Sequence, residues 1–250
     1  MHYTTTFIII ALVFLLSAAA FSAQVDAVQP KSCEITKGFL MKTVKVSGKS
    51  IKYVAYVPPT YDPKKPAPTI VFLNGAGECG TDGLRQIVVG LGSAVMTDVE
   101  KWPFIILFPQ KQTVKSNWED EDAMVMAILA KTKKELNVDS SRLYLTGLSQ
   151  GGHGTWAIAA KHPDIFAAIA PICGWGDETI AKKLTKMPVW AFHGDADEAV
   201  PVAASVDMKK NLEAAGGSCR LTIYPGVGHN SWDKGYRDEF LAEWFLQYHK

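Results

Sequence analysis

Residues 147–152 have the types and spacing in which a serine can act as a nucleophile. The sequence there is Gly147-Leu148-Ser149-Gln150-Gly151-Gly152, between an apolar run, Leu143–Thr146, and a helical run, Gly151–Lys161. A strand, a sharp turn and a helix would therefore place the Ser149 hydroxyl at the apex of the turn. The flanking glycines leave room for a strained turn, and the helix N-terminus favours negative charge. A Gly/Ser-rich turn without chemistry is the alternative.

A serine hydroxyl becomes a useful nucleophile when a neighbouring base removes its proton, and histidine has the pKa for that task. His229 lies in a glycine-bounded loop after the expected strand Arg220–Tyr224, from which it could reach over Ser149. We therefore predict His229 as the base. His153, one turn into the following helix, would line the pocket, and His193, at a strand end, would anchor its neighbouring loop.

The base needs a carboxylate that fixes its tautomer. Asp195 and Asp197 both follow the expected strand Val189–Phe192. Asp197 lies deeper in the loop and is favoured, whereas Asp195 is expected to tie down its own turn through an Asx hydrogen bond. The predicted catalytic residues are therefore Ser149, Asp197 and His229.

A tetrahedral intermediate carries an oxyanion that needs hydrogen-bond donors, each typically worth about 3 kcal/mol of barrier. The backbone N–H of Gln150, directly after the serine, is one candidate. Ala76, in the Gly-rich segment Asn74–Gly83 after a buried strand, is the second. That segment is no Walker phosphate loop, because no Gly-Lys-Ser/Thr closes it. A loop with tight turns is the plainer interpretation.

Strands alternate with helices from Thr69 onward, which predicts a mostly parallel sheet with helices on both faces. Strand-to-helix loops of such a sheet share one edge, where ligands bind. The expected strands are Met41–Val46, Ile51–Val57, Thr69–Leu73, Phe104–Phe108, Leu143–Thr146, Phe166–Ile172, Val189–Phe192 and Arg220–Tyr224, and helices are expected over Gly151–Lys161, Val202–Ala215 and Trp232–Tyr248.

The Gly-rich Asn74–Gly80, the segment Ser141–Ser149, His193–Pro201 and Gly228-His229 together resemble the α/β-hydrolase superfamily. The likeness is to its dienelactone-hydrolase-type branch and to extracellular esterases grouped with poly(3-hydroxybutyrate) depolymerase-like and feruloyl esterase-like proteins, often labelled predicted peptidases. It extends from about Val44 to the C-terminus. It implies an α/β-hydrolase fold, with about eight strands, in which Gly147–Gly151 forms the nucleophile elbow.

The resemblance also implies a serine carboxylic-ester hydrolase that works through an acyl-enzyme and needs neither cofactor nor metal. Carbohydrate-linked, phenolic or hydroxyacyl esters are the expected substrates. A serine peptidase of the prolyl-oligopeptidase-like type and a catalytically silent binding protein remain alternatives. Asn74 stands where relatives usually have histidine, and Gln150 where methionine is frequent. The predicted oxyanion donors are main-chain groups, so neither change should abolish activity, although Asn74 would alter loop rigidity.

Three tryptophans fall near the expected catalytic edge: Trp118, Trp175 and Trp232. Aromatic faces suit a flat ring or a sugar, so Trp118 and Trp175, with His153, are predicted to bind substrate. Edge packing is the alternative for both tryptophans. For Trp232, at the head of the last helix, packing is the favoured role.

The N-terminus has the pattern of a signal peptide. Phe7–Ala20 is a short apolar block followed by small residues, with cleavage sites near Ala20 and Ala27. We expect residues 1–27 to be a signal peptide, 28–40 a linker and 41–250 the catalytic domain, which would be secreted or periplasmic. An uncleaved membrane anchor is the alternative, although the block is short for a bilayer span.

The balance of charges limits the partners. With 26 basic and 25 acidic residues, the formal net charge is +1, which gives no electrostatic case for nucleic acid or an anionic membrane. We expect no nucleic-acid partner and no stable membrane association after signal cleavage. A small-molecule or polymer-linked ester is the expected partner, and the oligomeric state stays open.

The acidic run Glu119–Asp122 suggests either a metal site or the first turn of a helix. The second interpretation is favoured, because lysines follow in the last turns of the same helix and acids suit a helix N-terminus.

The four cysteines, Cys33, Cys79, Cys173 and Cys219, match no zinc pattern and allow three pairings. Cys79 and Cys173 both follow expected strands and are thus expected on the same edge. A disulfide between them is one hypothesis, and buried free thiols are the other.

Overall fold

The computed structural model describes residues 35–250; the predicted signal peptide, Cys33 and most of the predicted linker lie outside this range. The strands are β1 (Gly38–Val46), β2 (Lys49–Val57), β3 (Ala67–Leu73), β4 (Ile105–Pro109), β5 (Val138–Leu148), β6 (Ala168–Ile172), β7 (Trp190–Gly194) and β8 (Arg220–Tyr224). The helices are the 3-10 turns η1 (Arg85–Ile87) and η2 (Trp118–Glu121), and α1 (Leu91–Thr97), α2 (Asp122–Glu135), α3 (Gln150–Lys161), α4 (Glu178–Lys183), α5 (Ala203–Ala214), α6 (Trp232–Arg237) and α7 (Leu241–Phe245).

The eight strands form one sheet in the order β1-β2-β4-β3-β5-β6-β7-β8. The β1–β2 and β2–β4 pairs are antiparallel, and the pairs from β4 to β8 are parallel. The predicted mostly parallel sheet of about eight strands is therefore confirmed. Since the parallel strands run in the same direction, the loops that follow β3, β4, β5, β7 and β8 meet at one edge.

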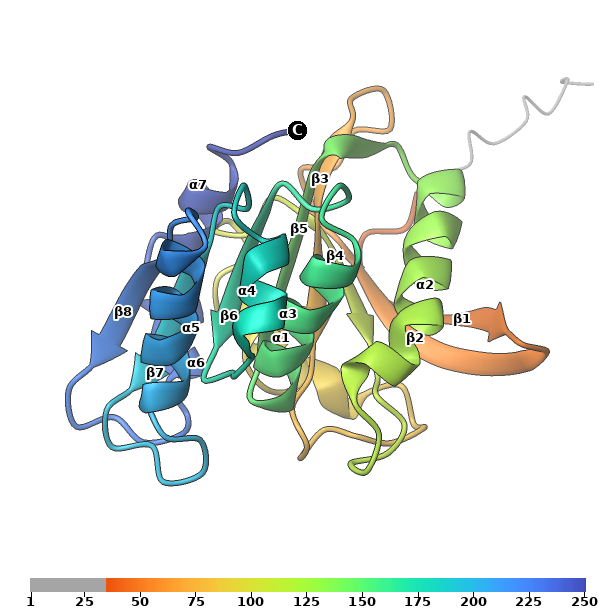
Figure 1. Ribbon diagram of the computed structural model, residues 1–250. Helices are drawn as coiled ribbons and strands as arrows, with labels where there is room; N and C mark the ends of the chain where they lie inside the picture. Colours follow the sequence, from red (N-terminus) through yellow and green to blue (C-terminus); the bar gives the residue numbers. More distant parts are fainter. Residues whose placement is uncertain (1–34) are drawn as a thin grey trace, which may run out of the picture. The chain divides into compact units, whose positions relative to one another are not determined.

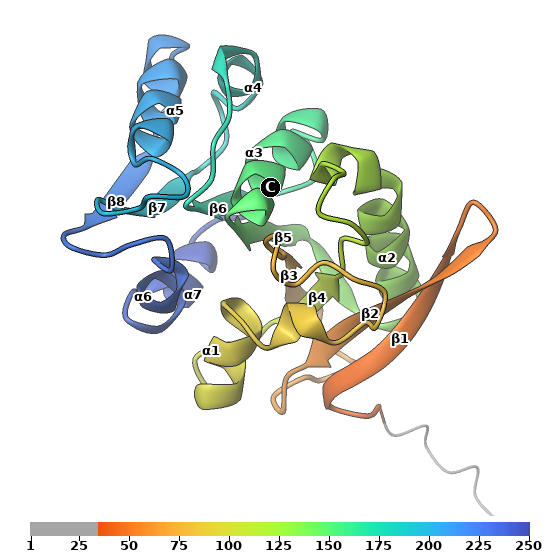
Figure 2. The same ribbon diagram turned by 90° about the horizontal axis from the view of Figure 1, so that it is seen from below.

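Helices cover both faces of the sheet. Seen along the sheet, α2, α3, α4 and α5 lie on one face, and α1, α6 and α7 lie on the other (Figures 1 and 2). The buried strand β3 contributes side chains to the hydrophobic core on both faces of the sheet. Val71 and Leu73 pack on the first face, and Ile70 and Phe72 pack on the second. This explains why its sequence is continuously apolar instead of alternating.

Each strand expected from the sequence is present in the structure, and the main differences are in where the strands begin and end. β1 begins at Gly38, inside the predicted linker, and β5 begins at Val138, five residues before the apolar run starts. The first half of β5 is polar and half-buried, so hydrophobicity alone does not mark it. The short helices η1, α1 and α4 have no counterpart in the sequence-based assignment.

The last expected helix is two helices. α6 ends at Arg237, and α7 starts at Leu241. A continuous helix would bury Phe240, one turn after Tyr236, but Phe240 is 72% exposed and Leu241 is fully buried instead. The break shifts the buried face by one residue, so that both helices pack on the same layer of the sheet.

Within residues 35–250, no helix is both long enough and apolar enough to cross a membrane.

The proposed Cys79–Cys173 disulfide is wrong, since both thiols are free, as is that of Cys219. The thiol of Cys79 donates within its own loop to the Gly75 carbonyl at 3.5 Å. The sulfur of Cys173 instead accepts a hydrogen bond from the backbone N–H of Ser149 at 3.3 Å. The two side chains lie at the same sheet edge, but each has a local partner.

Candidate active site

Ser149 lies on a strained turn between β5 and α3. Its φ is 55°, in the left-handed region that residues with a side chain rarely adopt. The turn is possible because the flanking residues are glycines, which leave room for close packing of the backbone. A Cβ on Gly147 would lie 2.4 Å from the Gly151 carbonyl oxygen, and one on Gly151 would lie 1.9 Å from the Leu73 carbonyl oxygen. The N–H of Ser149 is anchored to the Ile172 carbonyl at 3.0 Å. Sequence and packing thus fix the position of the hydroxyl.

The three predicted catalytic side chains form one chain of hydrogen bonds. Ser149 Oγ is 2.9 Å from His229 Nε2, and His229 Nδ1 is 2.7 Å from Asp197 Oδ2. They come from the loops after β5, β7 and β8, far apart in sequence. The Asp197 side chain is fully buried, whereas the His229 side chain is 28% exposed.

Asp197 is held in place as an ionised acceptor. Its Oδ1 accepts hydrogen bonds from the N–H groups of Ala199 and Val200, both at 2.9 Å. Burial alone would raise the pKa of Asp197, but the hydrogen bonds from His229 and Val200 hold it below its usual value. An ionised Asp197 accepts the Nδ1–H of His229, so the Nε2 lone pair faces the Ser149 hydroxyl. This arrangement can remove the serine proton.

Asp195 and His193 brace the same loops. Asp195 was expected to tie its own turn, but its Oδ1 accepts from the N–H of Gly226 at 2.6 Å and so fixes the loop that carries His229. The local turn bonds belong to Asp197 instead. His193 is fully buried, and its ring bonds Ser205 Oγ at 2.7 Å and the Val200 carbonyl at 2.8 Å, as expected of a loop anchor. Its Nε2 also lies 3.2 Å from Asp197 Oδ2.

The two predicted oxyanion donors lie in segments that touch. Gly75 packs against Leu148, the residue before Ser149, so closely that a Cβ there would lie 2.8 Å from the Leu148 side chain. The Gly75 N–H donates to Glu78 Oε2 at 3.0 Å. Within residues 35–250, the N–H groups of Ala76 and Gln150 donate to no other protein group. Both N–H groups can therefore donate to a substrate oxygen.

Asn74 is buried and joins several parts of this region. Its Nδ2 donates to the Gly75 carbonyl at 2.6 Å, and its Oδ1 accepts from the Lys111 N–H at 3.1 Å. Its carbonyl accepts from Trp118 Nε1 at 3.0 Å. The asparagine therefore stiffens the start of the Gly-rich loop.

Trp118 does not line a pocket, which corrects its predicted role in substrate binding. The side chain is fully buried and wedged against α3, where a Cβ on Gly154 would lie 2.5 Å from the Trp118 Cβ. A ring without exposed surface cannot stack on substrate. The edge-packing alternative is the correct one.

Trp175 and His153 remain at the surface of the site. Their rings stack with centroids 4.9 Å apart and an interplanar angle of 10°. His153 Nδ1 bonds the Trp175 carbonyl at 2.9 Å, and Nε2 bonds Glu119 Oε1 at 3.0 Å. Burial alone would lower the pKa of His153, but these hydrogen bonds raise it above its usual value. Trp232 packs edge-on to His229 with centroids 5.4 Å apart, consistent with a packing role.

The acidic residues of the run Glu119–Asp122 have different roles. Asp120 Oδ2 accepts from the Asn117 N–H at 2.9 Å at the start of η2, and Asp122 opens α2, so the helix-start interpretation holds for them. Glu119 instead faces His153 across the site. Its role in the site was missed, and no feature of the sequence separates it from its acidic neighbours.

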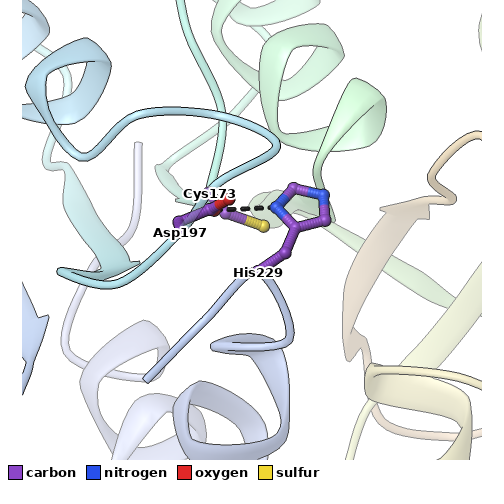
Figure 3. A group of neighbouring side chains, drawn as sticks. All are labelled: Cys173, Asp197 and His229. Carbon is purple, nitrogen blue, oxygen red and sulfur yellow. Dashed lines mark hydrogen bonds and ion pairs between the residues drawn. The ribbon is translucent and has the colours of Figure 1, made fainter. Parts of the chain in front are cut away.

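Cys173 lies directly beside the hydrogen-bond chain of Ser149, His229 and Asp197. Its sulfur, an Asp197 oxygen and a His229 ring nitrogen all lie within 4.8 Å of one another, a set that could hold a metal ion (Figure 3). However, the Asp197 and His229 atoms already bond each other at 2.7 Å. Burial raises the pKa of the Cys173 thiol to about 12, so it stays neutral near pH 7 and does not compete with Ser149 as a nucleophile.

The sequence matches the model of the dienelactone hydrolase family over residues 103–239, more than half of the chain. The chain belongs to this family. A carboxymethylenebutenolidase homologue of Methylorubrum extorquens is 34% identical over 156 residues, which cover 51% of this chain and 52% of the relative. A bifunctional acetylxylan esterase/xylanase of Neocallimastix patriciarum is 30% identical over 99 residues, which cover 38% of this chain and 15% of that protein. The chain therefore spans about half the length of the first of these curated relatives.

Among solved structures, that of a thermostable esterase superposes with a TM-score of 0.76 and 33% sequence identity, covering 85% of this chain and 63% of the other. Together with the strand order, this confirms the predicted α/β-hydrolase fold.

Proposed function

We propose that this member of the dienelactone hydrolase family hydrolyses carboxylic esters with Ser149, His229 and Asp197 as its catalytic triad. The observation that carries the proposal is the continuous hydrogen-bond chain, 2.9 Å from Ser149 Oγ to His229 and 2.7 Å from His229 to Asp197. Membership in a family of hydrolases and the likeness to a thermostable esterase support the same reaction.

In the first half of the reaction, Ser149 Oγ attacks the ester carbonyl carbon while His229 Nε2 takes the hydroxyl proton. The carbonyl π electrons move to its oxygen, and the oxyanion accepts hydrogen bonds from the N–H groups of Ala76 and Gln150. The C–O bond to the alcohol then breaks, and the alcohol leaves with the proton from His229. Asp197 keeps the imidazolium oriented and stabilised throughout.

In the second half, His229 removes a proton from water, whose oxygen attacks the acyl carbon. The second tetrahedral intermediate collapses, the acid leaves, and the proton returns to Ser149. The Cys173 thiol takes no part, because it is buried and its pKa is raised.

The proposed substrates are carbohydrate-linked, phenolic or hydroxyacyl esters. The Trp175–His153 stack offers a flat face one helical turn from Ser149, whose carbonyl accepts from the His153 N–H at 3.0 Å. The similar segment of an acetylxylan esterase/xylanase supports an ester on a carbohydrate. A secreted or periplasmic location is proposed from the apolar leader Phe7–Ala20.

The test is a panel of acetyl, feruloyl, hydroxybutyryl and longer acyl p-nitrophenyl esters, assayed with wild type and Ser149→Ala. We expect turnover with wild type and its loss in the variant, with fluorophosphonate labelling of wild type only. Equal rates for the two proteins would refute the proposal.

A further inference from the structure

Lys111 is a fully buried lysine at the catalytic edge, two residues after β4. Its ammonium donates to Gln150 Oε1 at 2.6 Å, to the Ser116 carbonyl, and more weakly to the Val114 carbonyl at 3.5 Å. An ammonium has three N–H groups, so the available donors are all used. Every acceptor is neutral, and no carboxylate of residues 35–250 forms an ion pair with it.

A buried cation without a negative partner is unusual, since lysine is rarely fully buried unless it is paired. Transfer of such a charge into the protein carries a large desolvation cost, which neutral acceptors offset only in part. The neighbouring acid Glu119 bonds His153 rather than Lys111. Glu119 interacts with the Lys111 charge through space, but the resting site holds this positive charge without a counter-ion in contact.

The backbone of Lys111 holds the loop that carries Ala76, one of the two predicted oxyanion donors. Its N–H donates to Asn74 Oδ1 at 3.1 Å, and its carbonyl accepts from the Gly80 N–H at 2.9 Å. The two bonds fix both ends of the segment in which Ala76 lies. The side chain meanwhile bonds the side chain of Gln150, the residue of the other predicted donor. One residue thus connects the two halves of the oxyanion site.

We propose that Lys111 is a positioning residue that fixes the Ala76 and Gln150 amides and whose buried positive charge is balanced when the oxyanion forms. This inference rests on the proposed ester hydrolysis. The ester carbonyl in the ground state is almost neutral, so the charge interacts weakly with bound substrate. It interacts strongly with the tetrahedral intermediate, and interactions of that kind raise kcat without lowering KM.

The test compares Lys111→Met, which removes the charge at similar volume, with Lys111→Arg, which keeps it. Lys115→Met is the matched control, because Lys115 is exposed on the same loop. Each protein is assayed for kcat and KM on p-nitrophenyl acetate and for unfolding in urea. The Ki of an aryl trifluoromethyl ketone is also measured, because attack of Ser149 Oγ on the ketone carbon would form an oxyanion that resembles the tetrahedral intermediate.

For Lys111→Met we expect kcat to fall 10- to 100-fold with KM within threefold of wild type, and the trifluoromethyl ketone Ki to rise by a similar factor. Lys111→Arg should recover part of both, and Lys115→Met should match wild type. Replacing a buried charge by an apolar side chain is often neutral or stabilising, so urea stability should not fall in parallel with kcat. Should Lys111→Met fail to fold, Lys111→Gln keeps a hydrogen-bond donor without the charge and should show the same losses.

Unchanged kcat and ketone affinity in the neutral variants would overturn the inference, as would a loss of kcat that Lys111→Arg does not recover in any part. A wild type that neither turns over esters nor reacts with fluorophosphonate would instead defeat the proposed function itself. The two failures are therefore distinguishable.

Discussion

Two of the carboxylate–histidine pairs at the catalytic edge, Asp197–His229 and Glu119–His153, differ in what the second ring nitrogen of the histidine contacts. In the Asp197–His229 pair, that nitrogen faces the Ser149 hydroxyl at 2.9 Å. In the Glu119–His153 pair, it faces the Trp175 carbonyl at 2.9 Å. A hydroxyl can donate its proton to a ring nitrogen, but a carbonyl can only accept.

This difference decides what each histidine can do. Because a carbonyl and a carboxylate both accept, His153 is held as a donor at both nitrogens, which is why its pKa is raised despite its burial. His229 has one acceptor and one hydroxyl, so its neutral form fits and can take a proton. A neighbouring carboxylate alone therefore does not make a histidine a general base; the group on its other side does.

The largest effect on activity is expected from a substitution that breaks the Asp197–His229 pair. In Asp197→Asn, the amide can no longer act as a charged acceptor for His229, so the ring loses the tautomer in which Nε2 accepts the serine proton. We expect kcat/KM on p-nitrophenyl acetate to fall by about 10⁴-fold, the loss typical of this substitution in serine hydrolases.

The matched control is Glu119→Gln, which makes the same chemical change in the second pair. Since His153 bonds Trp175 and not Ser149, kcat/KM on the acetyl ester should fall less than about tenfold, far below a loss of general-base catalysis. Similar losses in both variants would contradict the assignment of His229 as the only base.

A smaller effect on substrate binding is expected from removing the Trp175 ring, which stacks on His153 of the second pair. Trp175→Ala removes the ring that stacks on His153 but keeps the carbonyl that its Nδ1 bonds. An aromatic stack contributes about 0.5–1.5 kcal/mol, so KM for a feruloyl ester should rise about 2- to 10-fold. The value of kcat should change little.

The acetyl p-nitrophenyl ester serves as the internal control for this variant, because it shares the leaving group of the feruloyl ester but has no ring on its acyl side. Phe240→Ala, at an aromatic side chain that is 72% exposed between α6 and α7, is the control substitution. If KM rises equally for the acetyl and feruloyl esters, Trp175 shapes the site in general and does not recognise a ring.

The sequence predicts the first pair but not the second, for a physical reason. Ser149, Asp197 and His229 each follow a parallel strand, and the edge of a parallel sheet brings such positions together. Glu119 and Lys111 come from the segment between β4 and α2, which has no repeating pattern, so their partners depend on how that segment folds back. The choice between Trp118 and Trp175 depends on burial, which a loop sequence does not determine.

The second pair should also be visible in the pH dependence of stability. The folded pKa of His153 is raised, so the pair stabilises the fold below the unfolded value of about 6.5, and this contribution is lost as pH rises through the folded value. Urea unfolding of wild type and His153→Gln should therefore differ more at pH 5.5 than at pH 8.5, by at most about 1 kcal/mol, because Glu119 is partly exposed. An equal difference at both pH values would show that His153 is neutral in the folded protein.

The carboxylate–histidine pair of Asp122 and His162 gives the smallest expected effect and the strictest control. His162 Nε2 bonds Asp122 Oδ1 at 2.7 Å, and Lys161 bonds the other oxygen of Asp122 at 2.8 Å, where α3 ends beside the start of α2. Asp122→Asn should lower the free energy of unfolding by about 1 kcal/mol, as expected for a partly exposed ion pair. It should leave kcat/KM within about twofold, because His162 lies a full helix away from Ser149. A large loss of activity here would mean that the α2–α3 contact sets the geometry of the elbow, and the contrast between the first two pairs would then have to be measured in proteins that keep this contact intact.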